Sequence, residues 1–296
     1  ARDELVIATK VAGFMPNSPI AAARTVPPTT DPMPDCRLDG ASVRAACEAS
    51  LRRLKTDRID LLQLHWPDRY VPVFGQTQYI HDSARDDAVE IEETASALRD
   101  LMEEGKVRAI GLSNETPLGV CEWARVTEKL GIRDSLATIQ NSYSLVDRRF
   151  DSDLAEACAH HGVGLLPWSI LAGGLLSGKY RPDAPVPAAP ESRFVSYPDY
   201  MRRWSPVSAS KATVDAVNEY AKIAEGAGMT PSQLAIEFVR SRRFVSDCGS
   251  VILGATTVEQ LEENLEPFEG KVALDADILD AINEVHMRCR DPSCSL

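Results

Sequence analysis

Short apolar runs alternate with amphipathic helical stretches along all 296 residues, and this alternation constrains the fold more than any other feature. Six runs predict strands, at residues 5–10, 59–65, 107–113, 136–140, 163–168 and 250–254. The segments between them carry apolar residues at helical spacing. Strands separated by helices form βαβ units with a parallel sheet. Since no G-x-G-x-x-G segment occurs, we expect an α/β fold that is a barrel or a doubly wound sheet without that fingerprint.

The helical segments have recognisable ends. Asp39 is expected to cap the first helix, Gly105 follows the helix over about 92–104, and Pro117 opens the next one at its first position. Further helices are expected around Leu154 and Cys158 and over residues 208–226, 231–242, 258–265 and 276–287. No linker divides the chain, so residues 1–296 are predicted to form a single domain.

Composition excludes several classes of protein. The chain has 32 basic and 44 acidic side chains, a net charge of −12, which argues against a nucleic-acid or anionic-membrane surface. The sequence contains no run of 18 apolar residues, so no transmembrane helix is expected. The seven cysteines are odd in number and include no C-x-x-C, so neither a disulfide framework nor a zinc knuckle is expected. A pairing of Cys289 with Cys294 is disfavoured, and we expect a reducing compartment.

Polar or aromatic side chains stand where the first five predicted strands end. They are Lys10, His65, Ser113 with Asn114, Gln140 with Asn141, and Trp168 with Ser169. Taken singly, each has a structural explanation: a solvated lysine, a packed histidine or a core tryptophan. In a (β/α)₈ barrel, however, the carboxyl ends of the strands form the catalytic rim. Their joint occurrence therefore predicts an active site there.

Six segments carry a family resemblance: VIATK, IDLLQLHWPDR, GKVRAIGLSNET, TIQNSYSL, GLLPWSILAGGLLSGKY and LGATTVEQLEENLE. They span residues 5 to about 266, and together they resemble the aldo-keto reductase superfamily, in particular its Tas-type members. The segment HWPDRYVPVFG is most similar to the plant and algal branch. The resemblance implies a (β/α)₈ TIM barrel that reduces small carbonyl compounds to alcohols with NADP(H) by hydride transfer.

The resemblance also implies roles for individual residues. Lys10 matches the lysine that lowers the pKa of a catalytic tyrosine, and His65 matches the histidine that orients the substrate carbonyl. Ser113, Asn114 and Gln140 match positions that hold the nicotinamide carboxamide, and Trp168 matches the aromatic residue stacked on the ring. The other cofactor positions are matched by Ser169, Leu171, Gly173, Lys179, Arg193, Gly254, Ala255, Thr256, Gln260, Glu263 and Asn264. The basic pair that some members place in the last helix is lacking, so NAD(H) stays an alternative to NADP(H).

The aspartate and tyrosine of the family have no match in this sequence. Asp215 and Tyr220 have the required D-x-x-x-x-Y spacing, but they fall inside a predicted helix, and we reject them. Because a strand is predicted to begin at Leu5, only three residues after Ala1, and only six of eight βα units are visible, we expect the first two units, roughly 60–80 residues, to be missing. A fragment of a reductase, a naturally shortened protein and an erroneous gene model would each explain this.

The sequence is compatible with three functions. The first is an active reductase, and the second is a catalytically impaired barrel that serves as a structural or redox-sensing subunit, with a protein partner covering the open barrel edge. The third, another class of barrel enzyme, is disfavoured because no metal-ligand cluster accompanies His65 and because His160 and His161 are adjacent, a spacing that does not form a ligand pair on a helix.

Four aromatic residues could line an apolar substrate pocket, or they could serve only in ordinary loop packing. They are Trp66, Phe74, Tyr79 and Tyr143. The cytoplasm and the plastid both stay open as the location of the protein, because a targeting segment is not observable.

Overall fold

The computed structural model describes residues 2–15, 36–73, 76–180, 194, 202–206, 209–270, 273–288 and 290–292. The chain divides into two compact units. The first comprises Ala1–Val71, Tyr79–Gln140 and His160–Val163, and the second comprises Pro72–Gln78, Asn141–Ala159 and Gly164–Leu296. The single domain over residues 1–296 stays a prediction.

The first unit is built on four parallel strands in the order β1-β2-β3-β4. Their bounds are Ala8–Val11 (β1), Ile59–Leu64 (β2), Val107–Ser113 (β3) and Leu136–Gln140 (β4). The predictions for these strands are confirmed, except that β1 begins three residues late. Its predicted first residues, Leu5 and Val6, are exposed, and the amide of Ile7 donates to the Asp60 carboxylate at 2.9 Å instead of continuing the strand ladder.

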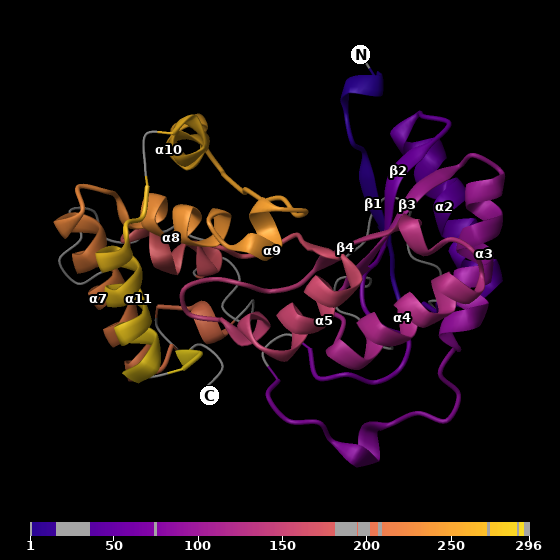
Figure 1. The fold of residues 1–296 in the computed structure, drawn as a ribbon, viewed down its shortest axis with the longest axis horizontal. Coiled ribbons are helices and arrows are strands. Elements are labelled where there is room, and N and C mark those ends of the chain that lie inside the picture. Colours follow the sequence, from indigo (N-terminus) through magenta and orange to yellow (C-terminus); the bar gives the residue numbers. More distant parts are fainter. Residues whose placement is uncertain are drawn as a thin grey trace. The chain divides into compact units, whose positions relative to one another are not determined.

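Helices α2 (Gly40–Leu54), α3 (Ile91–Glu103) and α4 (Pro117–Lys129) pack in the first unit, where Figure 1 shows α2 and α3 side by side. As predicted, Asp39 caps α2 by accepting from the Ser42 amide at 2.9 Å. The apolar stripes of the helices are buried against the sheet; Leu62 of β2 and Leu98 of α3 are inaccessible to water. Each such side chain contributes about 1.5–3 kcal/mol of hydrophobic stabilisation.

The second unit is mainly helical. It holds strand β5 (Gly164–Leu165) and helices α7 (Lys211–Gly226), α8 (Pro231–Arg240), α9 (Arg243–Ser246), α10 (Val258–Leu265) and α11 (Ala276–Arg288), and α5 (Asp153–His161) begins in it. Helix α8 is its core, since Leu234, Ile236 and Phe238 are fully buried. Its start is set by a capping box between Thr230 and Gln233. Helices α7 and α11 lie side by side in Figure 1.

Short 3₁₀ turns complete the described chain. They are η1 (Arg2–Glu4), η2 (His81–Ser83), η3 (Arg133–Ser135), η4 (Arg149–Asp151), η5 (Ala172–Ser177), η6 (Arg202–Trp204) and η7 (Glu266–Glu269). None of the helices in these residues is long and apolar enough to cross a membrane. The five cysteines that the structure describes are free thiols, and Cys289 and Cys294 lie outside the described residues.

Two strand predictions for the second unit need correction. Only Gly164 and Leu165 of the run 163–168 form a strand, and Trp168 makes an isolated parallel bridge with Ser142. Residues 250–254 form no strand. They meet β5 through one hydrogen bond, from the Ser250 amide to the Leu165 carbonyl at 3.2 Å. Because β5 is only two residues long, no ladder of several hydrogen bonds forms between it and residues 250–254.

Candidate active site

The carboxyl ends of the four strands in the first unit bring the predicted residues together. Lys10 of β1 is paired in register with Gln63 of β2, Gln63 with Gly111 of β3, and Ser113 with Gln140 at the ends of β3 and β4. Because side chains alternate along a strand, these residues share one face of the sheet. We call this the polar face. The intervening residues, among them Leu62, Leu64, Ile110, Leu112 and Ile139, point to the opposite, apolar face.

Hydrogen bonds tie three of the strand ends together. The Ser113 hydroxyl donates to the Gln140 carbonyl at 2.9 Å, and the Asn114 amide donates to the same carbonyl at 3.1 Å. The Asn114 side chain donates through Nδ2 to the His65 carbonyl at 2.9 Å. Asn114 takes a left-handed backbone, with φ 52°, which asparagine tolerates better than most residues. Asn114 therefore links the end of β2, next to His65, to the ends of β3 and β4.

Lys10 and His65 carry perturbed acid–base properties. Burial lowers the pKa of Lys10 below its ordinary value of 10.5. Burial, followed by the positive charge of Lys10, lowers the pKa of His65 from 6.5 to about 4. The histidine is therefore neutral at physiological pH. A fixed cation beside a neutral imidazole can stabilise a negative oxygen and orient it through a hydrogen bond.

Gln63 was not among the predicted site residues. It is buried on the polar face, and its Nε2 donates to Oε1 of Gln140 at 2.9 Å. The signal was in the sequence: a single amide among the leucines at positions 61, 62 and 64, just before His65. A buried amide needs a partner, and strand alternation would have placed it on the face of His65.

The second unit places Trp168 at the start of a tightly turned segment. Ser169, Gly173 and Gly174 all have positive φ, and the Ala172 amide donates to the Ser169 carbonyl at 2.7 Å. Successive residues in such conformations turn backbone N–H groups toward a concavity that suits anions. Lys179 lies close by, because a Cβ on Gly174 would lie 3.0 Å from its Nζ. The predicted residues Ser169, Leu171, Gly173 and Lys179 thus belong to one compact turn around η5.

A buried ionic network lies beside Trp168, and its members were not predicted. Asp147 accepts from Arg203 Nη1 at 3.1 Å, from Arg149 Nε at 2.9 Å and from the Ser142 hydroxyl at 2.7 Å. Burial acts to raise the pKa of Asp147, but the bond and charge of Arg149 and the charge of Arg203 outweigh it and lower that pKa. The Arg203 guanidinium stacks on Trp204, 4.2 Å from the ring centre, and Trp204 meets the Trp168 ring edge to face.

The remaining predicted cofactor residues lie at and before the start of α10. The Gln260 side chain accepts from the Thr256 amide at 3.0 Å, and Asn264 donates to the Gly254 carbonyl at 3.4 Å. Glu263 accepts from the Thr230 hydroxyl at 2.7 Å, which joins α10 to the start of α8. The full predicted set here is Gly254, Ala255, Thr256, Gln260, Glu263 and Asn264. Arg193 lies outside the described residues.

The structure shows the surroundings of three other residues considered for the site. Asp215 is exposed on α7 and pairs with Lys211, whereas Tyr220 is buried on another face of that helix. Burial raises the pKa of Tyr220 well above its ordinary value, opposite to what a catalytic phenol needs. Both residues lie inside a helix, as predicted. Tyr143 belongs to the core, where its hydroxyl donates to Asp151 at 2.6 Å. Phe74 lies outside the described residues.

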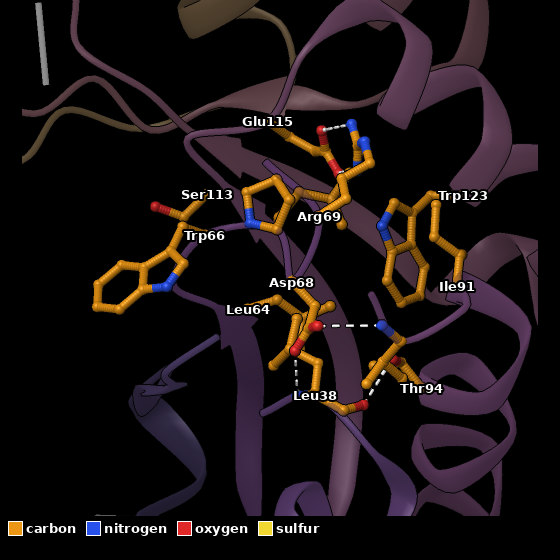
Figure 2. Close-up of a pocket in the computed structure, with 13 residues that line it drawn as sticks. Leu38, Leu64, Trp66, Asp68, Arg69, Ile91, Thr94, Ser113, Glu115 and Trp123 are labelled. Carbon is orange, nitrogen blue, oxygen red and sulfur yellow. Dashed lines mark hydrogen bonds and ion pairs between the residues drawn. The ribbon is translucent and has the colours of Figure 1, made fainter. Parts of the chain in front are cut away.

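Figure 2 shows a small pocket of the first unit, about 30 Å³, which is room for about two water molecules. Leu64 and Leu112 line it, so it lies against the apolar face of the sheet rather than the polar face. Arg69 and Glu115 flank it with a two-bond ion pair at 2.8 and 2.6 Å. Of the strand-end residues, only Ser113 is in the lining that Figure 2 draws, so the pocket is part of the packing between sheet and helices rather than the place where Lys10 and His65 lie.

Comparison with known proteins gives the family. The sequence model of the aldo/keto reductase family matches residues 1–286. The chain belongs to the aldo/keto reductase family. It is 38% identical to "Protein tas" of Escherichia coli over 287 residues, which cover 97% of the chain and 75% of that protein.

The names of two further relatives state a function. The chain is 30% identical to the human "Aflatoxin B1 aldehyde reductase member 4" over 254 residues, 82% of the chain and 69% of that protein. It is 29% identical to the "Putative voltage-gated potassium channel subunit beta" of Schizosaccharomyces pombe over 285 residues, 96% of the chain and 72% of that protein.

Family membership and the parallel strands confirm the predicted α/β fold of the (β/α)₈ barrel type, and membership supports an oxidoreductase. The family match starts at residue 1, so it does not support the prediction that two βα units are missing. Aldo/keto reductases generally use NAD(P)H. In the first unit, the amide and hydroxyl groups at the ends of β3 and β4 suit a carboxamide group. In the second unit, the positive-φ turn next to Lys179 suits a phosphate group. Among the described residues, no cluster of three or more ligating side chains could hold a metal.

Proposed function

We propose that this chain reduces aldehydes or ketones to alcohols with NADP(H). The observation that carries the proposal is that Lys10 and a neutral His65 stand at the ends of neighbouring strands. When bound, NADPH supplies a hydride to the carbonyl carbon of the substrate. Negative charge then develops on the carbonyl oxygen, and the protein must stabilise it.

Lys10 and His65 have separate tasks in this proposal. The ammonium group of Lys10 stabilises the developing oxyanion, and because it is half-buried its field is weakly screened. The neutral imidazole of His65 donates a hydrogen bond that orients the carbonyl. The family resemblance adds a tyrosine hydroxyl as proton donor, and no position of this sequence matches it. The proposal therefore assigns orientation and charge stabilisation to Lys10 and His65, and leaves proton donation outside their roles.

We assign the cofactor-binding residues from the family resemblance and from the local structure of each unit. In the first unit, Ser113, Asn114 and Gln140 would bind the nicotinamide carboxamide. In the second, Trp168 would stack on the nicotinamide ring and the turn from Ser169 to Lys179 would bind the pyrophosphate. The adenosine phosphate would be held by Arg193, Gly254, Ala255, Thr256, Gln260, Glu263 and Asn264. NADP(H) rather than NAD(H), and membership of the plant and algal branch, are parts of this proposal.

NADPH titration of the whole chain tests the cofactor part. We expect quenching of tryptophan fluorescence, with the quenching reduced in Trp168→Phe. The loss of NADPH absorbance with a panel of aldehydes tests the reaction. Lys10→Met and His65→Gln should each lower that rate at least about 10-fold. Lys129→Met is the matched control, since Lys129 pairs with Glu92 on the surface. Unchanged reduction in both site variants, or no binding of NADPH, would refute the proposal.

One comparison favours a second candidate function. The relative from Schizosaccharomyces pombe is named as a potassium channel β subunit, and it matches 96% of this chain. A catalytically impaired barrel that acts as a structural or redox-sensing subunit would bind NADPH without reducing aldehydes. It would also co-purify in a stable complex from its source, with a protein partner on the barrel edge. Cytoplasm and plastid both stay open as its compartment.

A further inference from the structure

We propose that Gln63 is a positioning residue that sets the orientation of the Gln140 side-chain amide. This inference rests on the proposed function, in which Gln140 binds the carboxamide of the nicotinamide. Gln63 does not itself contact the cofactor in this scheme. It acts through Gln140, by the hydrogen bond from its Nε2 to Gln140 Oε1 at 2.9 Å.

The bond spans an intervening strand. Gln63 lies on β2 and Gln140 on β4, with β3 between them. Neighbouring strands are about 4.8 Å apart, so the two backbones are separated by roughly 10 Å. Two glutamine side chains are long enough to meet over the middle strand, and a shorter polar residue at either position is not. The length of both side chains is therefore part of the arrangement.

Gly111 provides the space for this crossing. It is the register partner of both Gln63 and Thr138. A Cβ at position 111 would lie 2.7 Å from Cγ of Gln63 and 2.9 Å from Oγ1 of Thr138, both closer than real Cβ contacts. The φ of Gly111 is not in the left-handed region. Glycine is thus required here for the room it leaves and not for its backbone conformation.

The buried position of Gln63 makes the bond directional. Its side chain is almost inaccessible to water, so its amide hydrogens need acceptors within the protein. Gln140 Oε1 accepts one of them, which turns the Nε2 of Gln140 away from Gln63 and leaves it free to donate elsewhere. An amide held this way presents a defined group to the carboxamide of the cofactor. Without Gln63, the Gln140 amide could rotate by 180° at little cost.

Binding measurements on the whole chain test the inference. The variants are Gln63→Met, which keeps the length and removes the amide, and Gln63→Asn, which keeps the amide and cannot reach Gln140. We expect both to raise the Kd of NADPH about 3- to 10-fold, the effect of one lost hydrogen bond. The Kd of 2′-phospho-ADP-ribose, which lacks the nicotinamide, should change less than about twofold. Gln140→Met should give the same pattern, and adding Gln63→Met to it should cause no further loss.

The outcomes separate this inference from the proposed function. If the unaltered chain does not bind NADPH, the proposed function fails. If it binds and Gln140→Met weakens binding while both Gln63 variants do not, the proposed function stands and the positioning role of Gln63 is refuted. Equal weakening of both ligands by Gln63→Met and Gln63→Asn would also refute it, because that is the result of a general structural defect. If Gln63→Met fails to fold, Gln63→Asn alone decides.

Discussion

Asp147 and Arg203 form an ion pair, with 3.1 Å between Oδ2 and Nη1, in which only 1% and 3% of the two side chains are exposed. Breaking a buried pair by removing one charge leaves the other uncompensated. We expect Asp147→Asn to lower the free energy of unfolding by about 3–5 kcal/mol. Urea denaturation would measure this loss.

The exposed pair of Lys211 and Asp215 on α7 is the matched control. Asp215→Asn should change the free energy of unfolding by less than about 1 kcal/mol, because exposed pairs contribute little. Equal losses in Asp147→Asn and Asp215→Asn would show that burial does not strengthen the Asp147–Arg203 pair.

The positive charge of Lys10 should have a measurable effect on the pKa of His65. Removal of that charge in Lys10→Met takes away one of the two causes that lower the pKa of His65 to about 4. The pKa should therefore rise, yet stay below 6.5, because burial is the larger cause. Nitrogen chemical shifts of the imidazole across a pH titration give the value. A pKa that does not move would place Lys10 too far from His65 for the mechanism proposed.

Protonation of His65 should make the protein sensitive to acid. The unfolded chain takes up the proton near pH 6.5 and the folded chain only near pH 4, so the folded state becomes less favourable as pH falls between these values. The free energy of unfolding should decrease by up to about 1.4 kcal/mol per pH unit in this window. In His65→Gln that contribution is absent. Parallel stability curves for the two proteins between pH 6.5 and 4 would contradict the buried, neutral histidine.

Two glycines of the second unit should tolerate no side chain. A Cβ on Gly164 would lie 2.0 Å from the Cys248 carbonyl oxygen, and one on Gly249 would lie 2.1 Å from the Leu165 carbonyl oxygen. Both obstacles are backbone, which cannot rotate away. Gly164→Ala and Gly249→Ala should each destabilise by at least about 1–3 kcal/mol in thermal or urea unfolding.

Gly226, at the end of α7, is the matched control for these substitutions. A Cβ there meets nothing within 4 Å, and its φ is not in the left-handed region. Gly226→Ala should leave stability unchanged or raise it by up to about 1 kcal/mol, since alanine favours helix. If Gly164→Ala behaved like Gly226→Ala, the close approach of β5 to residues 248–249 would be wrong.

Local sequence signals were sufficient for most elements. The strands β3 and β4 and the helix α10 have the bounds that periodicity predicted, and Asp39 caps α2 as expected. These elements are set by neighbouring residues: apolar spacing, capping side chains and proline positions. The short β5 and the absent strand at 250–254 could not be predicted in this way. Their apolar residues suit a strand, but a strand exists only where a partner offers backbone hydrogen bonds over several residues.

The positions of the candidate site residues could be predicted from the sequence, since Lys10, His65, Ser113, Asn114 and Gln140 stand at the ends of apolar runs and resemble one family. Tertiary structure alone decided how they are held. The bond from Gln63 to Gln140 crosses β3 and joins residues 77 positions apart, and Asp147 meets Arg203 over 56 positions. Spacing along a chain sets which residues share a strand or helix face. Contacts between distant segments depend on register, on burial and on the room left at a residue such as Gly111.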